Sequence, residues 1–318
     1  MSSRAPIALF IYRRPEHTRR TLLSLIACDE LADSPFCIYC DGPKTPDALA
    51  EVRETRRVAR SLAPVSATFI ERDTNHGLAR SIIVGTTELT KKFGRVIVVE
   101  DDLEVARDFL RFMNDGLDRY ANDDRVMQVS GYQFPLDPPL ATHPVFFSFT
   151  TSWGWATWTR AWKHFDADAS GYAQVKADRE LRRRFELDGS YPYFEMLERQ
   201  RRGEIDSWAI RWHLSVFMHG GLVLYPGRSL VHNTGFDGSG THGAPGWEST
   251  GLAELPAIHD QLPDVVLDAV AQRRVFAFLA SRNSTTALTR AKQLAAKWLP
   301  ASWISAGKRF IRAKEGSK

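Results

Sequence analysis

Residues 96–99, an unbroken run of valine and isoleucine, constrain the fold more than any other part of the sequence. A short, β-branched run of this kind is typical of a strand that is buried on both faces. Such strands occur in parallel sheets whose two faces are covered by helices. The run is followed directly by Glu100, Asp101 and Asp102, so three acidic residues are expected at the end of a buried strand.

The first 125 residues alternate short apolar runs with amphipathic segments of helical length. This alternation predicts an α/β fold with a mainly parallel, Rossmann-like sheet flanked by helices. We expect strands at residues 7–12, 36–40, 67–70 and 96–99, and helices at about 15–27, 47–62, 78–91 and 106–120. Residues 1–125 are therefore predicted to form a first lobe.

The pattern changes beyond residue 126, where prolines interrupt it and four tryptophans occur between residues 153 and 162. A smaller and less regular second lobe is predicted for residues 126–260. It should contain strands at 146–150 and 222–225 and helices at about 177–185 and 208–219. Residues 261–318 are predicted to form a helical, basic tail.

Polar residues follow each of the four predicted strands of the first lobe. They are Arg13 and Arg14, Asp41, Glu71 and Arg72, and Glu100, Asp101 and Asp102. In an open parallel sheet, ligands bind beyond the carboxyl ends of the strands. Any one of these residues alone is explained as a solvated loop residue, but together they predict a site.

The three consecutive acids predict a divalent metal, because crowded carboxylates at the end of a buried strand repel one another and lose solvation. Carboxylate oxygens are hard ligands that suit Mn²⁺ or Mg²⁺, and either ion can also bind the phosphates of a nucleotide. Alternation along the strand directs Glu100 and Asp102 to one side and Asp101 to the other. Asp102 is the first choice as a direct ligand, and Asp101 is the second.

These residues carry a resemblance to a known family. Residues 96–109, VIVVEDDLEVARDF, resemble the metal-binding segment of eukaryotic N-acetylglucosaminyltransferase I, and residues 6–245 resemble a GT-A glycosyltransferase of the kind grouped in the large bacterial family 2. The resemblance implies a GT-A fold and a UDP-sugar donor. It makes residues 1–125 the nucleotide-sugar-binding lobe and residues 126–260 the acceptor-binding, catalytic lobe.

The resemblance also implies roles for donor-binding residues. Asp41 would accept a hydrogen bond from uracil, and Asn75, Gly77 and Arg80 would form the family's N-x-G-x-x-R segment. Arg14 and Arg80 would lie near the ribose or the diphosphate, where a guanidinium matches phosphate oxygens. The alternatives are an Asp-Gly turn at Asp41 and surface arginines at the two other positions.

Inversion at an anomeric carbon requires a general base that takes the proton of the acceptor hydroxyl. Asp206 is the best candidate, because it opens a predicted helix and resembles the Asp-x-Trp element of these enzymes. Glu204 is the reserve candidate. The alternative role for Asp206 is that of a helix N-cap.

Two further segments of the second lobe fit a sugar-binding site. Trp153 and Trp155 could stack on the apolar faces of a sugar, with core packing as the alternative and as the expected role of Trp158 and Trp162. A glycine-rich segment at residues 232–242 could close over the donor. Its His232 and His242 could contact the metal or the diphosphate, or could simply belong to a surface loop.

The net charge of +4 is concentrated near the end of the chain, where residues 288–318 carry eight Lys or Arg against a single Glu. This asymmetry argues against nucleic acid as a partner. The amphipathic, basic pattern suggests peripheral membrane contact, with a helix docked on the protein as the alternative. No membrane-spanning or secretory pattern is evident, so a cytoplasmic location is expected.

The sequence thus favours a metal-dependent inverting glycosyltransferase that moves a GlcNAc-type or other hexose from a UDP-sugar to a glycan or lipid-linked hydroxyl. Two other classes remain open. A sugar-1-phosphate nucleotidyltransferase would share the sheet and the metal, but should carry a G-x-G-T-R loop where this chain has residues 12–15, YRRP. A carbohydrate-binding protein without catalytic activity is the other alternative.

Overall fold

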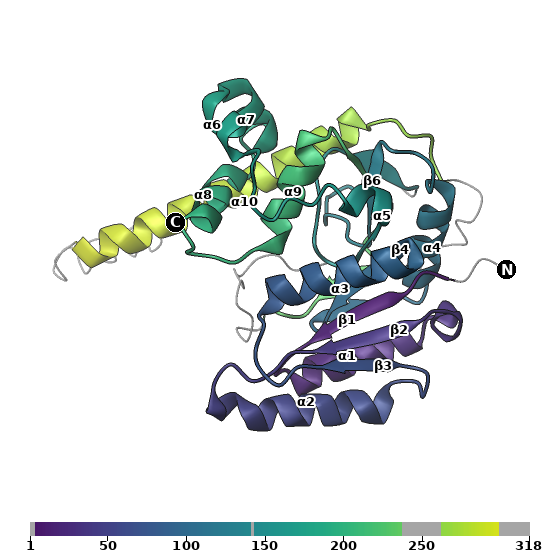
Figure 1. Cartoon of the computed structure of the whole chain (residues 1–318). Coiled ribbons are helices and arrows are strands. Elements are labelled where there is room, and N and C mark those ends of the chain that lie inside the picture. The colour runs from purple at the N-terminus through teal and green to yellow at the C-terminus, as the bar shows by residue number, and fades with distance from the viewer. Residues whose placement is uncertain (1–3, 141–142, 237–261, 299–318) are drawn as a thin grey trace, which may run out of the picture.

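The computed structural model describes residues 4–140, 143–236 and 262–298 of the 318-residue chain, with side chains up to residue 283. Its centre is an eight-stranded sheet in the order β3-β2-β1-β4-β8-β6-β9-β7 (Figure 1). Four of the seven strand pairings are parallel, so the predicted α/β class with a mainly parallel sheet is confirmed.

The first lobe closely follows the prediction. Its elements are β1 (Ile7–Ile11), α1 (Pro15–Ile26), β2 (Phe36–Cys40), α2 (Leu49–Leu62), β3 (Thr68–Glu71), α3 (Leu78–Phe93), β4 (Arg95–Glu100) and α4 (Phe109–Arg119), with short 3-10 turns at Asp29–Asp33 and Pro46–Ala48. Pro15 opens α1, where its fixed φ suits the first turn. Gly94 ends α3 in the left-handed region at φ +81°.

The order of the strands reverses between β1 and β4, both of which are fully buried at their centres. Helices α1 and α2 contact each other, and α3 packs against β1 and β4 (Figure 1). The carboxyl ends of β1, β2 and β4 therefore lie together at one edge of the sheet. Open sheets bind their ligands at such a reversal of strand order.

Four strands beyond residue 125 extend the same sheet. They are β6 (Val126–Ser130), β7 (Val145–Phe147), β8 (Trp155–Trp158) and β9 (Leu222–Tyr225). Strand β8 pairs antiparallel with both β4 and β6, and so joins the two predicted lobes. β5 (Leu103–Val105) follows β4 directly in the chain and pairs antiparallel with the distant β10 (Val231–Asn233) in a separate two-stranded sheet.

The described residues between β8 and β9 form five helices. They are α5 (Thr159–Trp162), α6 (Tyr172–Ala177), α7 (Arg179–Phe185), α8 (Tyr193–Arg201) and α9 (Trp208–Met218). Residues of α6 to α9 share a small apolar cluster of their own that includes Phe185, Phe194 and Leu214. The side chain of Ser207 caps α9 by accepting a hydrogen bond from the amide of Ile210 at 3.3 Å.

The last helix, α10 (Ala269–Trp298), packs its first turns on the body of the protein and extends beyond it in Figure 1. Val275 and Leu279 are buried, and the amide of Ser148 donates a hydrogen bond to Gln272 at 2.8 Å. Residues 288–298 of the predicted tail belong to α10, and residues 299–318 lie outside the described part. Among the described residues, no helix is long and apolar enough to span a membrane.

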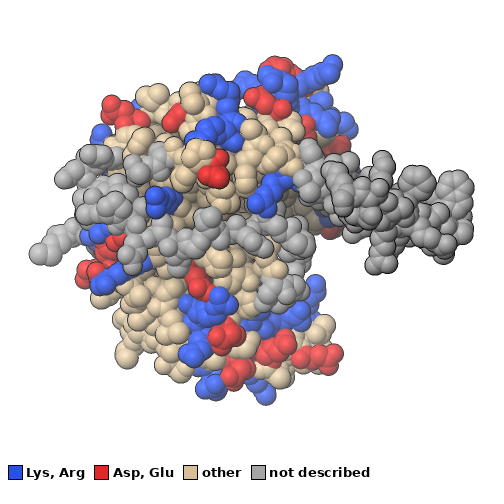
Figure 2. Space-filling view, turned by 180° about the vertical axis from the view of Figure 1, so that it is seen from behind, with Lys and Arg blue, Asp and Glu red and all other residues tan. Residues whose placement is uncertain are grey.

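Charged side chains of both signs are interspersed over the face shown in Figure 2.

Candidate active site

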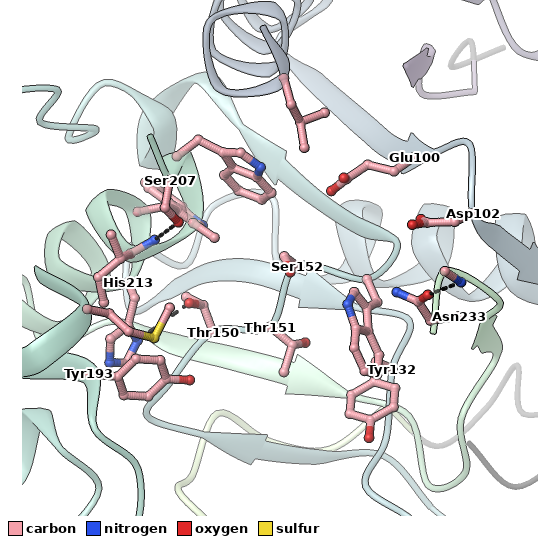
Figure 3. Close-up of a pocket in the computed structure, with 18 of the residues that line it drawn as sticks. Glu100, Asp102, Tyr132, Thr150, Thr151, Ser152, Tyr193, Ser207, His213 and Asn233 are labelled. Carbon is pink, nitrogen blue, oxygen red and sulfur yellow. Dashed lines mark hydrogen bonds between the residues drawn. The ribbon is translucent and has the colours of Figure 1, made fainter. Parts of the chain in front are cut away.

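A pocket of about 380 Å³ lies beyond the carboxyl end of β4, where the two lobes meet (Figure 3). Glu100 and Asp102 line one side of it, and Ser207, His213 and Tyr193 line the other. Its remaining lining residues include Arg14, Leu78, Tyr132, Phe134, Thr150, Thr151, Ser152, Trp153, Tyr191, Met196, Asp206, Trp208, Ile210, Asn233, Gly235, Phe236 and Leu279. The pocket therefore joins the acidic end of β4 to the second lobe.

The three consecutive acids point in different directions, as the alternation along the strand predicted. Glu100 and Asp102 line the pocket, whereas Asp101 turns into the fold and is 4% exposed. The carboxylate of Asp101 accepts hydrogen bonds from the amide of Tyr12 at 3.2 Å and from Arg14 at 2.5 Å. Asp101 thus anchors the loop after β1, while Asp102 and Glu100 face the pocket.

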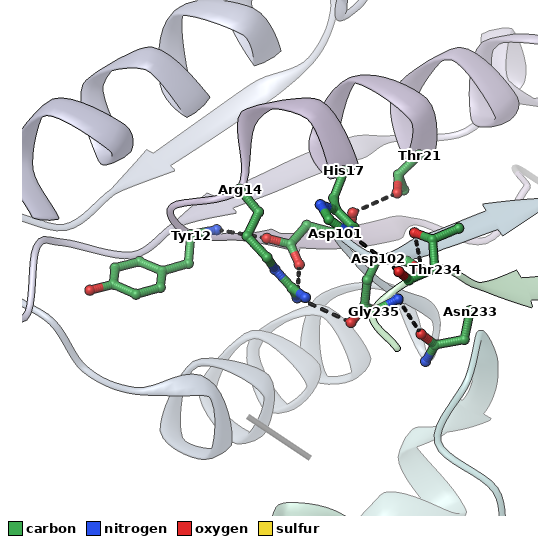
Figure 4. Close-up of polar contacts among 9 residues, drawn as sticks. All are labelled: Tyr12, Arg14, His17, Thr21, Asp101, Asp102, Asn233, Thr234 and Gly235. Atoms are coloured by element: carbon green, nitrogen blue, oxygen red, sulfur yellow. Dashed lines mark hydrogen bonds and ion pairs between the residues drawn. The ribbon is translucent and has the colours of Figure 1, made fainter. Parts of the chain in front are cut away.

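Arg14 bridges the two aspartates from the start of α1 (Figure 4). Its Nη2 lies 2.5 Å from Asp101 Oδ1 and 3.1 Å from Asp102 Oδ2. Burial by itself would lower the pKa of this guanidinium, but the two carboxylates outweigh burial and raise it. Its Nη1 is buried and has no hydrogen-bond partner among the described residues. A buried donor without a partner is costly, and an anion bound beside Arg14 would supply the missing partner.

Electrostatics at the end of β4 favour a cation. Burial raises the pKa of Glu100 well above its usual range, and the neighbouring Asp102 and Asp101 raise it further. Burial also raises the pKa of Asp101, to about 6, although Arg14 opposes this shift. The positive charge of Arg14 alone therefore does not compensate this cluster.

The residues present fit a divalent metal that takes few ligands from the protein and most of the others from a bound nucleotide and water. No group of three or more His, Cys, Asp or Glu side chains gathers as a metal site within the described residues. However, Mg²⁺ in nucleotide sites is commonly bound by one or two carboxylates, with phosphates and water completing its shell. Asp102 and Glu100, facing the pocket together, provide that number of protein ligands.

The segment after β10 holds Asp102 in place. The backbone carbonyl of Asp102 accepts hydrogen bonds from the amide of Thr234 at 2.8 Å and from its hydroxyl at 3.1 Å. A Cβ at Gly235 would lie 2.4 Å from Asp102 Oδ2, so a larger residue there would displace the Asp102 carboxylate. The beginning of the predicted glycine-rich segment is thus part of the site, while its remainder, including His242, lies outside the described residues.

Asp206 lines the same pocket from the second lobe. It precedes α9 but does not cap it, because Ser207 does, so the alternative role as N-cap is wrong. One carboxylate oxygen accepts a hydrogen bond from Arg211 Nη2 at 2.7 Å, and the Asp206 side chain is 67% exposed. Glu204, the reserve candidate, instead pairs with Arg199 and Arg202 on the surface and does not line the pocket.

The tryptophans divide between the pocket and the core. Trp153 lines the pocket and makes edge contacts with Tyr132 and Phe236, at centroid distances of 4.5 Å and 5.5 Å. Trp155 is 0% exposed and stacks on Trp208 at 4.9 Å, so the expectation that it contacts a sugar is not met in this structure. Strand β8 turns Trp155 into the core, where Trp158 and Trp162 are also buried.

Asp41 organises a loop. Its Oδ1 accepts hydrogen bonds from the amides of Gly42 and His76, and its Oδ2 accepts them from the side chain of Asn75 and the amide of Gly77, all between 2.8 and 2.9 Å. A carboxylate has about four acceptor sites, so none is left for uracil. The structure therefore assigns Asp41, Asn75 and Gly77 to shaping the turn that leads into α3, and not to base recognition through Asp41.

This arrangement makes Asp41 important for stability. In the Asp41→Asn variant an amide nitrogen replaces one acceptor and faces two donors, so we expect the free energy of unfolding to fall by about 2 kcal/mol. Urea denaturation measures this change, and Asp73→Asn, an exposed position on the same loop, is the matched control with no expected effect. Equal stability of both variants would show that the four hydrogen bonds contribute little.

Two other predicted donor-binding residues lie outside the pocket lining. Arg80 is exposed on the first turns of α3. His232 lies in β10, where the strand register places it opposite Glu104 of β5. Neither is brought to the pocket in this structure.

The sequence did not single out several residues of the lining. Tyr132 and Phe134 follow β6, Tyr191 and Tyr193 lie at the start of α8, and Leu279 comes from α10. These residues are far apart in the chain and carry no motif. Their apolar character alone predicted a core position, and only the tertiary structure places them around a cavity.

Fold and pocket together define an α/β protein with a mainly parallel sheet and a carboxylate-bearing pocket at the carboxyl ends of its strands. No protein-family model matches the sequence, and no curated protein is significantly similar to it.

Three solved structures illustrate what the fold is similar to. A mannosyltransferase from Pyrobaculum calidifontis in complex with GDP-Man and Mn²⁺ is 17% identical over 48% of this chain and 44% of its own, with a TM-score of 0.34. Glucosyl-3-phosphoglycerate synthase from Mycobacterium tuberculosis in complex with Mn²⁺ and UDP is 12% identical over 51% and 59%, with a TM-score of 0.32. A UDP-glucose pyrophosphorylase complexed with UDP-glucose is 7% identical over 70% and 90%, with a TM-score of 0.33.

This chain thus matches less than two thirds of the length of the mannosyltransferase and of the synthase. Identity and TM-score are low in all three comparisons. The residues of the pocket therefore provide the evidence for a function.

Proposed function

We propose that the protein is a metal-dependent inverting glycosyltransferase of the GT-A type, which transfers a sugar from a UDP-sugar to a hydroxyl of a glycan or glycolipid. One observation carries the proposal. A single pocket holds the acidic end of a buried central strand, with Arg14 beside it, and also holds a separate carboxylate, Asp206, from the second lobe. Transfer with inversion needs these two groups of residues, one for the leaving diphosphate and one for the acceptor.

The donor side would bind the diphosphate. Asp102 and Glu100 would hold Mn²⁺ or Mg²⁺, which would neutralise charge on the leaving diphosphate when bound. Arg14 would donate from its buried Nη1 to a phosphate oxygen, while its Nη2 stays on Asp101. Trp153 would pack against the apolar face of the transferred sugar.

The acceptor side would supply the base. Arg211 holds one oxygen of Asp206, which leaves the other oxygen to accept the proton of the attacking hydroxyl. As that proton moves to Asp206, the acceptor oxygen bonds to the anomeric carbon and the bond to the diphosphate breaks. The base and the leaving group would lie on opposite sides of the sugar, which is the geometry of inversion.

Purified protein incubated with a panel of UDP- and GDP-sugars and Mn²⁺ tests the proposal. We expect binding of at least one donor and slow release of its sugar to water, measured as free nucleoside diphosphate. Formation of a nucleoside triphosphate from a donor and pyrophosphate would instead indicate a nucleotidyltransferase. Failure to bind any donor would contradict the proposal.

A further inference from the structure

Part of the pocket lining is aromatic or apolar and has no role in the donor binding proposed above. We call it the aromatic arm, and it consists of Tyr132, Phe134, Tyr191, Tyr193, Met196, Ile210 and Leu279. These residues come from the segment after β6, from the residue Tyr191 just before α8, and from α8, α9 and α10. The arm opens into the same cavity as Glu100 and Asp102, so a molecule placed in it would reach the reaction centre.

The walls of the arm are already packed. Tyr193 contacts Tyr191 at a centroid distance of 4.6 Å and His213 at 4.0 Å. Phe134 contacts Tyr132 at 5.1 Å and Phe278 of α10 at 6.3 Å. Side chains fixed by such contacts cannot easily collapse into the space, so the cavity is a preformed one.

Several polar groups beside the arm already have partners within the protein. The hydroxyl of Thr150 lies 3.4 Å from His213 Nδ1, and the other ring nitrogen of His213 lies 3.4 Å from the carbonyl of Phe185. The hydroxyl of Thr151 is bonded to Ser130 at 2.7 Å. Burial lowers the pKa of His213 to about 4, so its ring is neutral near pH 7. Tyr193 points its hydroxyl into the cavity in Figure 3.

The acidic and basic side chains that line the pocket lie outside the aromatic arm. Among the described lining residues, the side chains with a carboxyl or guanidinium group are those of Arg14, Glu100, Asp102 and Asp206, and none of them belongs to the aromatic arm. A sugar ring carries several hydroxyl groups, and most of them would lose water here without gaining a partner, because the arm offers only the hydroxyls of its tyrosines. A hydrocarbon group loses nothing of this kind and gains from leaving water.

We propose that the aromatic arm binds a hydrocarbon group of the acceptor, next to the hydroxyl that Asp206 activates. The acceptor is then an amphiphile, such as a lipid-linked or aryl-linked sugar or alcohol, and not an entirely polar glycan. This inference rests on the proposed function, because it concerns the acceptor of the same reaction. It rests on the chemistry of the cavity and not on the basic tail.

A chain-length series tests the inference. Methyl, butyl and octyl β-D-glucoside, each below its critical micelle concentration, are titrated into the full-length protein and followed by calorimetry. Because each buried methylene adds to affinity, we expect the octyl glucoside to bind at least tenfold more tightly than the methyl glucoside. Equal affinity for all three compounds would overturn the inference.

Two substitutions locate the binding. Met196→Asp places a charge in the arm and should abolish the gain from methyl to octyl, whereas Val65→Asp, at an exposed apolar position of the first lobe, should retain it. Met196→Gln, similar in size and uncharged, repeats the test if the aspartate prevents folding. If the Met196 variants still preferred octyl over methyl glucoside as strongly as the wild type, the octyl group would bind outside the aromatic arm. That result would refute the proposal.

The donor gives an independent readout. If the wild-type protein binds no nucleotide-sugar, the proposed function fails, whatever the glucosides do. If the protein binds a donor but its affinity for the glucosides does not depend on alkyl chain length, the proposed function stands and only the inference about the aromatic arm is wrong.

Discussion

The Asp206→Asn variant is expected to transfer sugar about 10²- to 10⁴-fold more slowly than the wild type, with unchanged affinity for the donor. This is the range that a positioned general base contributes to a proton transfer. Asparagine has nearly the shape of aspartate, and its carbonyl oxygen can still accept the hydrogen bond from Arg211. The variant therefore removes the proton acceptor while the geometry of the pocket is retained.

The matched control is Glu204→Gln, which changes an acidic residue two positions away that faces the surface and pairs with Arg202. We expect its transfer rate to stay within about twofold of the wild type, since surface ion pairs contribute little. Initial rates under saturating donor measure both variants. If the Glu204→Gln variant transferred sugar slowly and the Asp206→Asn variant at the wild-type rate, Glu204 would be the base. That result would contradict the assignment to Asp206.

The Asp102→Asn variant is expected to lose about a hundredfold in metal-dependent affinity for a UDP-sugar, equivalent to about 2.7 kcal/mol. An amide is a neutral and weaker ligand for a hard cation than a carboxylate. Asparagine can still accept a hydrogen bond from Arg14 through its carbonyl oxygen, so the fold of the loop should survive.

Calorimetric titration of the donor with Mn²⁺ and with EDTA measures this effect. The affinity in EDTA should be similar in the Asp102→Asn variant and in the wild type, which provides an internal control for folding. A variant in which Mn²⁺ still enhances binding as in the wild type would show that Asp102 is not a ligand.

Much of the first lobe could be predicted from the sequence because its signals are local. Strand β2 was predicted with its observed bounds, and α1 and α3 within two residues, since apolar runs, Pro15 and Gly94 mark their ends. The alternation that separates Asp101 from Asp102 also follows from strand geometry alone. These features depend on neighbouring residues in the chain.

The second lobe could not be predicted to the same extent, because its elements depend on distant partners. In the sequence, Trp153 and Trp155 fit a sugar-binding wall or a core equally well, and the structure buries Trp155 in β8, between β4 and β6. Only the pairing of β8 with those strands decides which face of Trp155 is covered. Likewise, the full set of hydrogen bonds to Asp41 forms only when the loop at residues 75–77 folds back onto β2.

The aromatic arm shows the same limit. Tyr132 and Leu279 are separated by 147 positions in the chain, and each has the composition of an ordinary core residue. A cavity exists there because several elements meet without filling the space between them. No local pattern in the sequence reports such a gap.

The central claim is that the acidic end of β4 binds a nucleotide-sugar through a divalent metal. Calorimetric titration of the wild-type protein with UDP, in Mn²⁺ and in EDTA, tests it most directly. We predict at least tenfold tighter binding in Mn²⁺. Equal affinity under the two conditions, or no binding of UDP or GDP in either, would contradict the claim.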